Sequence, residues 1–218
     1  VAAVRLALEL GYRLIDTAEM YGDGGAEEVV GEAIGQALRD GLCRRDDLVV
    51  VSKVLPHHAS RASTEAACVA SLRRLGLDHI DLYLLHWPGP HPLSETVAAF
   101  ERLQARGQIG RWGVSNFDLD AMTRLQALPG GGACAANQVC YSLTQRGIDV
   151  DLAPWQRRQG LPMMAYCPID QSALARHARL AGLAAERGWT AAQLALAWTL
   201  RDGAAIAIPK AVREPHLR

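Results

Sequence analysis

Short apolar runs alternate with amphipathic stretches along the whole chain, and this alternation limits most strongly what the chain can fold into. The runs are typical of buried strands, and the stretches between them have the apolar spacing of helices that cover a sheet. The predicted strands are residues 12–15, 48–51, 80–85, 111–114, 135–139, 163–166 and 204–208. Apolar strands that alternate with helices indicate a parallel sheet, either doubly wound or closed into a barrel.

Polar and glycine residues mark the ends of the predicted helices. Hydroxyl and carboxylate side chains accept hydrogen bonds from the first helical N–H groups, and glycine suits the left-handed turn that ends a helix. The predicted helices are 2–10, 26–38, one capped by Ser63 and ended by Gly76, one opened by Ser94 and ended by Gly107, one capped by Asp118, 151–159, and 191–201 capped by Thr190.

A conspicuous polar or aromatic residue closes each predicted strand, and this placement favours the barrel. The residues are Asp16, Lys53, His86, Ser115 with Asn116, Gln138, Tyr166 and Lys210. In a barrel all strand ends face one shared mouth, whereas in an open sheet ligand groups gather at one switch point. We therefore predict an α/β fold, a (β/α)8 barrel, as a single domain over residues 1–218.

The predicted barrel is incomplete by its own count. A full barrel has eight strands, and the alternation here accounts for roughly seven of them. Because the sequence opens within a helix, we expect the first strand to precede Val1 and the last helix to follow Arg218. Open sheet edges and uncovered apolar faces cost stability, so we expect the isolated chain to be poorly folded or inactive.

Charge and cysteine usage exclude several classes of protein. The 23 basic and 23 acidic residues cancel, which argues against nucleic acid, membrane surfaces or polyacidic substrates as partners. The 5 cysteines are odd in number and widely spaced, so we expect neither a disulfide framework nor a zinc site, and a cytoplasmic location. His57 and His58 are adjacent without a third ligand spaced to join them, so we expect no metal.

Several segments together resemble one enzyme family. They are residues 11–22 (GYRLIDTAEMYG), 51–54 (VSKV), 81–87 (DLYLLHW), 112–117 (WGVSNF), 137–138 (NQ), 165–168 (AYCP) and 208–210 (IPK). Over nearly its whole length the sequence is similar to the bacterial-type, NADPH-dependent aldo-keto reductases. The resemblance implies an oxidoreductase that reduces aldehydes or ketones to alcohols on a barrel of the predicted kind.

The family's catalytic Asp, Tyr, Lys and His match Asp16, Tyr21, Lys53 and His86. Reducing a carbonyl requires a proton for the oxygen, and free tyrosine, with a pKa of about 10, donates reluctantly. A nearby ammonium stabilises the phenolate that remains, and a carboxylate keeps the ammonium charged and oriented. The resemblance therefore implies that Tyr21 is the general acid, that Lys53 and Asp16 tune it, and that His86 orients the carbonyl.

The resemblance also implies NADPH (NADP+) as the cofactor. Ser115, Asn116 and Gln138 match the family's contacts to the nicotinamide carboxamide, and Tyr166 matches the aromatic ring that stacks on the nicotinamide. The matches to the 2′-phosphate contacts are Lys210, with Arg213 adding charge, and His216, where the family often has arginine. Trp87, beside His86, matches a wall of the substrate pocket.

Other readings of the same residues stay open at this point. Singly, Asp16 suits a turn, His86 suits a satisfied core histidine, Trp87 suits core packing, and Asn137 with Gln138 suits a strand-end cap. The same fold also serves as a nucleotide-sensing regulatory or binding module, and the chain as given could be an inactive fragment. We expect a monomer whose partner is a small aldehyde or ketone, with neither nucleic acid nor membrane as a partner.

Overall fold

The computed structural model describes residues 1–218, which divide into two compact units. The first unit comprises Val1–Ser115, Arg124–Cys134 and Ala211–Arg218, and the second comprises Asn116–Thr123 and Ala135–Lys210. Within each unit every pair of neighbouring strands is parallel. None of the helices combines the length and apolar character needed to cross a membrane.

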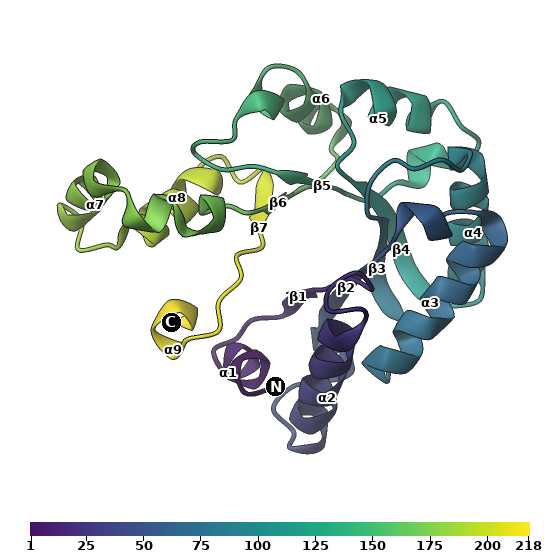
Figure 1. Ribbon diagram of the computed structural model, residues 1–218, viewed down its shortest axis with the longest axis horizontal. Coiled ribbons are helices and arrows are strands. Elements are labelled where there is room, and N and C mark those ends of the chain that lie inside the picture. Colours follow the sequence, from purple (N-terminus) through teal and green to yellow (C-terminus); the bar gives the residue numbers. More distant parts are fainter. The chain divides into compact units, whose positions relative to one another are not determined.

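The first unit contains four strands that pair in chain order. They are β1 (Leu14–Asp16), β2 (Val49–Val54), β3 (Ile80–Leu85) and β4 (Ile109–Ser115). The strands are covered on one side by α2 (Gly25–Arg39), α3 (Arg61–Leu75) and α4 (Leu93–Ala105), as Figure 1 shows. The short 3-10 helices η1 (Arg45–Asp47), η2 (Pro56–His58) and η3 (Gly131–Ala133) lie in the connections.

Two terminal helices close the first unit. Helix α1 (Ala2–Glu9) contacts both α2 and the short α9 (Glu214–Leu217). The hydroxyl of Tyr12 donates a hydrogen bond of 2.9 Å to the carbonyl of Leu217. The two ends of the sequence therefore lie side by side (Figure 1).

The second unit contains β5 (Asn137–Cys140), β6 (Met163–Tyr166) and β7 (Ala205–Ala207), again paired in chain order. Helix α6 (Leu152–Gln159) connects the first two strands, and α7 (Ala178–Ala185) and α8 (Ala191–Thr199) precede the third. Its 3-10 helices are η4 (Gly147–Asp149), η5 (Asp170–Ser172) and η6 (Leu174–Arg176). Helix α5 (Leu119–Gln126), which precedes β5, begins in the second unit and ends in the first.

An aromatic cluster fixes α4 against the strands that lead to the predicted site. Phe100 of α4 stacks on Trp112 of β4 with ring centroids 5.5 Å apart, and it meets Tyr83 of β3 edge to face at 5.8 Å. All three rings are fully buried. Buried aromatic pairs stabilise beyond the area they bury, so this cluster holds β3, whose end carries His86, in one position.

All predicted strands are present, but β2 is longer than the sequence indicated. It runs to Val54, so Lys53 lies inside the strand instead of closing it. Lys53 pairs with Leu84, and Val54 with Leu85, so the ladder to β3 continues past the two polar residues Ser52 and Lys53. The strand tolerates both because their side chains find partners, which are described below.

The predicted helix caps are correct in part. Asp118 and Thr190 accept the hydrogen bonds expected of them, from Ala121 N–H at 2.8 Å and from Gln193 N–H at 3.2 Å. The prediction for α3 is wrong, because Ser60 is the cap and accepts a bond from Ser63 N–H at 3.3 Å. Helix α4 begins at Leu93, before Ser94, after the turn made by Pro92.

The contact between α2 and α3 depends on Gly31. A Cβ atom at this position would lie 2.3 Å from the backbone oxygen of Leu75, which has no freedom to move aside. We expect Gly31→Ala to force the two helices apart and to lower the free energy of unfolding by about 1–3 kcal/mol, measured by urea denaturation. Gly35→Ala in the same helix is the matched control, since its Cβ would meet only the flexible end of Arg39 at 3.3 Å. Equal stability of the two variants would contradict this account.

Candidate active site

Three neighbouring strands of the first unit bring the four predicted catalytic residues together. Asp16 is the last residue of β1, Lys53 lies near the end of β2, and His86 directly follows β3. Tyr21 lies in the loop between β1 and α2. Because parallel strands in register end at the same edge of a sheet, the site follows from the order of these elements along the chain.

Lys53 is at the centre of this group and has no exposed surface. Its ammonium nitrogen donates to Oδ1 of Asp16 at 2.6 Å and to the carbonyl oxygen of Thr17 at 2.9 Å. The third contact, of 3.4 Å, is to the hydroxyl of Tyr21. An ammonium has three donors, so every proton of Lys53 faces an acceptor, which is what a buried charge requires.

The environment of Lys53 acts on its pKa in opposite directions. Burial lowers the pKa of the ammonium, and the charge and hydrogen bond of Asp16, with a further contribution from Glu27, partly offset that effect. The net direction is downward. Lys53 thus holds its proton less tightly than an exposed lysine does, while the adjacent carboxylate favours its charged form.

Tyr21 and His86 lie next to each other, close to Lys53. Tyr21 is 39% exposed, and its ring meets that of His86 edge to face with centroids 5.8 Å apart. Burial, and then the charge of Lys53, lower the pKa of His86 to about 4. The imidazole is therefore neutral near pH 7, with one nitrogen that donates and one that accepts. The ring of Trp87 lies 4.7 Å from that of His86.

A buried carboxylate on the other face of β2 escaped the sequence analysis. Glu27 of α2 has no exposed surface and accepts hydrogen bonds from the Ser52 hydroxyl at 2.5 Å and from Nε of Arg74 at 2.6 Å. It therefore ties α2 to both β2 and α3. Its signal is visible in the sequence, since Glu27 occupies the apolar stripe of α2 together with Val30 and Ile34.

A second carboxylate, Glu19, lies between Asp16 and Tyr21 in the loop after β1. Its Oε1 accepts a hydrogen bond of 2.6 Å from the backbone N–H of Leu55 and lies 3.1 Å from Nδ1 of His58. Sequence reasoning missed this residue because an acidic residue in a loop normally faces solvent. Only the course of the chain after β2 brings its partners within reach.

The predicted nicotinamide contacts lie at the ends of strands as well. Ser115 ends β4 in the first unit and is buried. In the second unit the hydroxyl of Tyr166 donates to Oδ1 of Asn116 at 2.8 Å, and Asn116 N–H donates to the carbonyl of Gln138 at 2.8 Å. Asn116 has a φ of 60°, a left-handed conformation that asparagine tolerates. The structure thus brings Asn116, Gln138 and Tyr166 together.

The predicted phosphate contacts are exposed. Lys210 follows β7 in the second unit, and its side chain faces solvent. In the first unit, Arg213 and His216 are also exposed, with a guanidinium nitrogen of Arg213 3.1 Å from Nε2 of His216.

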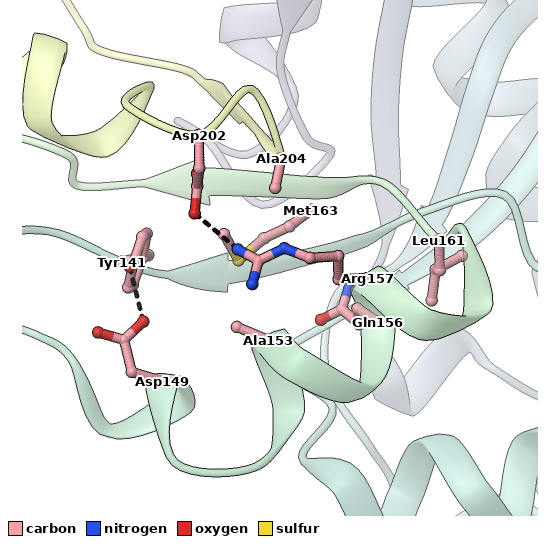
Figure 2. A pocket seen from close by; sticks show the side chains of 9 residues that line it. All are labelled: Tyr141, Asp149, Ala153, Gln156, Arg157, Leu161, Met163, Asp202 and Ala204. Carbon is pink, nitrogen blue, oxygen red and sulfur yellow. Dashed lines mark hydrogen bonds and ion pairs between the residues drawn. The ribbon is translucent and has the colours of Figure 1, made fainter.

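A hollow in the second unit is lined by none of the predicted site residues (Figure 2). Four of its polar side chains form two pairs: Tyr141 donates to Asp149 at 2.7 Å, and Arg157 binds Asp202 at 2.6 Å. The first pair joins η4 to the residue after β5, and the second joins α6 to the loop before β7. No group of three or more His, Cys, Asp and Glu side chains is arranged to hold a metal ion.

Comparison with known proteins assigns the family. The model of the aldo/keto reductase family matches residues 1–218. The chain is 49% identical to a methylglyoxal reductase of Escherichia coli, over 100% of the chain and 76% of that protein. It is 33% identical to a glyoxal reductase of Bacillus subtilis, over 99% of the chain and 74% of that protein.

Solved structures agree with this assignment. An aldo/keto reductase from Klebsiella pneumoniae in complex with NADP and acetate is similar with a TM-score of 0.93 and 50% identity, over 99% of the chain and 76% of that protein. The chain therefore belongs to the aldo/keto reductase family, and it is an oxidoreductase. The predicted fold class, a (β/α)8 barrel of which this sequence carries seven strands, is confirmed.

The pKa of His86 gives a direct test of the site's electrostatics. We expect its imidazole to titrate near pH 4 in NMR spectra of the folded protein, and Lys53→Met to raise that midpoint part of the way toward the ordinary value, because burial remains. Lys210→Met, which removes an exposed charge, should leave it unchanged. Unfolded histidine binds its proton at about pH 6.5, so the contribution of His86 to stability should fall as the pH drops from there toward 4. An ordinary midpoint for His86 in the wild type would contradict the site as described.

Proposed function

We propose that this protein reduces small aldehydes or ketones to alcohols with NADPH, and that 2-oxoaldehydes such as methylglyoxal are the substrate class. The observation that carries the proposal is the Lys53 ammonium, anchored on Asp16 at 2.6 Å and 3.4 Å from the hydroxyl of Tyr21. The similarity to a methylglyoxal reductase and a glyoxal reductase supports the substrate class.

Tyr21 is the general acid in this proposal. When the carbonyl carbon is reduced, negative charge develops on the oxygen, and a positioned phenol can neutralise it by giving up its proton. The ammonium of Lys53 stabilises the phenolate that remains, and Asp16 keeps that ammonium charged and directed at Tyr21. The partial exposure of Tyr21, 39%, supports a role in contact with substrate.

His86 orients the carbonyl in this proposal. A neutral imidazole can donate one hydrogen bond to the carbonyl oxygen without being the group that supplies the proton, which comes from Tyr21. The lowered pKa of His86 supports the neutral form. A donor aimed at an oxygen where charge develops lowers the barrier and fixes the angle at which the carbon is presented. We assign Trp87, which contacts the His86 ring, to the wall of the substrate pocket.

The residues present fit NADPH, which supplies the hydride when it is bound. A nicotinamide carboxamide offers both donor and acceptor atoms, and Ser115, Asn116 and Gln138 carry a hydroxyl and two amides that complement it. The ring of Tyr166, held by its hydrogen bond to Asn116, offers a flat surface on which to stack. The Klebsiella relative in complex with NADP supports this choice of cofactor.

Four further expectations belong to the same proposal. One family model spans residues 1–218, which supports a single barrel domain. The relatives named for methylglyoxal and glyoxal support a small-molecule partner. A monomeric state and a cytoplasmic location stay predictions from the sequence.

Lys210, with Arg213 and His216, is proposed to bind the 2′-phosphate of the cofactor. A charged hydrogen bond contributes about 1.5–3 kcal/mol, so we expect Lys210→Ala to raise the KM for NADPH by about 10-fold or more. The KM for NADH, which lacks this phosphate, should be nearly unchanged and serves as the internal control. Steady-state kinetics with both cofactors measure the difference, and a parallel loss with NADH would argue against phosphate recognition by Lys210.

Tyr21→Phe tests the catalytic assignment. We expect the variant to lose methylglyoxal reduction by about 100- to 10,000-fold, because the phenolic proton is gone while the ring remains. Cofactor binding, measured by quenching of tryptophan fluorescence, should be retained. Full turnover in the variant would refute the role of Tyr21. A wild type that binds NADPH tightly and reduces no member of a panel of aldehydes would instead favour a nucleotide-sensing module.

A further inference from the structure

The loop that carries Tyr21 is tied to Leu55, the residue directly after β2, by the side chain of Glu19. This side chain is only 8% exposed, although it belongs to a connection between a strand and a helix. Its Oε1 accepts the backbone N–H of Leu55 at 2.6 Å, two residues beyond Lys53. A buried carboxylate is costly unless it is hydrogen-bonded, so the position of Glu19 is determined by these partners.

Glu19 extends the hydrogen-bond ladder between β1 and β2 by one rung. The backbone bonds run from Thr17 N–H to the Val51 carbonyl at 2.9 Å and from Glu19 N–H to the Lys53 carbonyl at 3.4 Å. The chain then turns away, with Tyr21 N–H bonded to the Ala18 carbonyl at 3.1 Å. Leu55 directly follows β2, and its N–H is the next donor in line. The Glu19 carboxylate takes the place of the missing backbone carbonyl.

The other end of the same loop is held by Glu27. Its bond to Ser52 joins the start of α2 to the residue before Lys53. Two carboxylates therefore attach the segment 17–27 to the chain on either side of Lys53, Glu27 at Ser52 within β2 and Glu19 at Leu55 just after it. Tyr21 lies between the two attachments, so its distance from Lys53 is set by both.

We propose that Glu19 is a positioning residue for carbonyl reduction, which keeps the Tyr21 hydroxyl within reach of the Lys53 ammonium. The inference rests on the function proposed above, and Glu19 acts only through Tyr21 and Lys53. The distance concerned, 3.4 Å, is already long for a hydrogen bond, so a small displacement of the loop removes the contact. Displacing a catalytic group by about 1 Å costs up to about 100-fold in rate.

The first test compares three single variants by steady-state kinetics. We expect Glu19→Ala to lower kcat by about 10- to 100-fold with little change in KM. Glu19→Gln keeps an oxygen that accepts Leu55 N–H, so it should stay within a few-fold of wild type. Glu28→Ala, which removes an exposed carboxylate from the first turn of α2, is the matched control and should be unaffected. Normal activity of Glu19→Ala, or an equal loss in Glu19→Gln, would overturn the proposal.

A double variant separates positioning from a general loss of structure. In the Tyr21→Phe background the contact to Lys53 is already absent, so Glu19→Ala should lower the residual rate no further. Additive losses would show that Glu19 acts by another route and would overturn the proposal. If Glu19→Ala does not fold, Glu19→Asp replaces it, since its carboxylate is one methylene too short to reach Leu55 N–H.

The ionisation of Tyr21 provides a measurement that needs no turnover. The phenolate of Tyr21 is followed by ultraviolet absorbance during a pH titration. Subtracting the absorbance of the same protein with Tyr21→Phe leaves the signal of this one tyrosine. We expect Tyr21 to ionise at a higher pH in Glu19→Ala than in Glu19→Gln, because both variants lose the carboxylate charge but only Glu19→Ala loses the bond to Leu55 and with it the contact to the ammonium. The same ionisation pH in these two variants would overturn the inference even if the protein reduces carbonyls. A shift as expected would support it even if the proposed substrates fail.

Discussion

The ion pair between Lys53 and Asp16 is the interaction on which the rest of the site depends. A lysine with no exposed surface cannot stay charged unless an acceptor faces each proton, and Asp16 supplies the charged one. The register of the strands makes this pairing unavoidable. Asp16 lies opposite Val51, two residues before Lys53, and side chains two apart on a strand share a face. Moving either strand by one residue would turn one partner away and leave the other buried without a counter-charge.

Strand β2 carries a polar side chain toward each of its faces, which is unusual for the middle of a parallel sheet. Lys53 meets Asp16 on one face, and on the opposite face Ser52 meets the Glu27–Arg74 pair. The buried carboxylate of Glu27 affects its neighbours through its charge. It opposes the loss of the Lys53 proton and adds to the effect of burial that raises the pKa of Cys68 to about 12. The helix layer behind the sheet thus contributes to the electrostatics of the site in front of it.

The pattern of apolar and polar residues was sufficient to predict that the seven strands exist, because apolar runs bounded by glycine and polar residues have few alternatives. The four residues of the candidate site were predicted from the matched family motifs. The errors have local causes. Ser60 and Ser63 are both suitable caps, and only the position of the first helical turn decides between them. Two successive polar residues looked like the end of β2, whereas their partners lie in other elements. Glu27 could have been recognised as a charge within an apolar stripe. Glu19 could not, because its partner is a backbone N–H that only the course of the chain after β2 brings within reach.

The buried ammonium of Lys53 has different consequences for its two neighbours, Tyr21 and His86. A fixed ammonium favours the deprotonated form of any neighbour, but the consequence depends on the charge of that form. For Tyr21 the deprotonated form is a phenolate, so Lys53 makes the phenol a better acid in the proposed reaction. For His86 it is the neutral imidazole, and the same ammonium adds to burial in lowering the pKa to about 4. Groups whose proton affinities are separated in this way do not compete for one proton. The proposed division between Tyr21 as proton donor and His86 as a neutral orienting group therefore follows from the position of Lys53 between Asp16 and Tyr21.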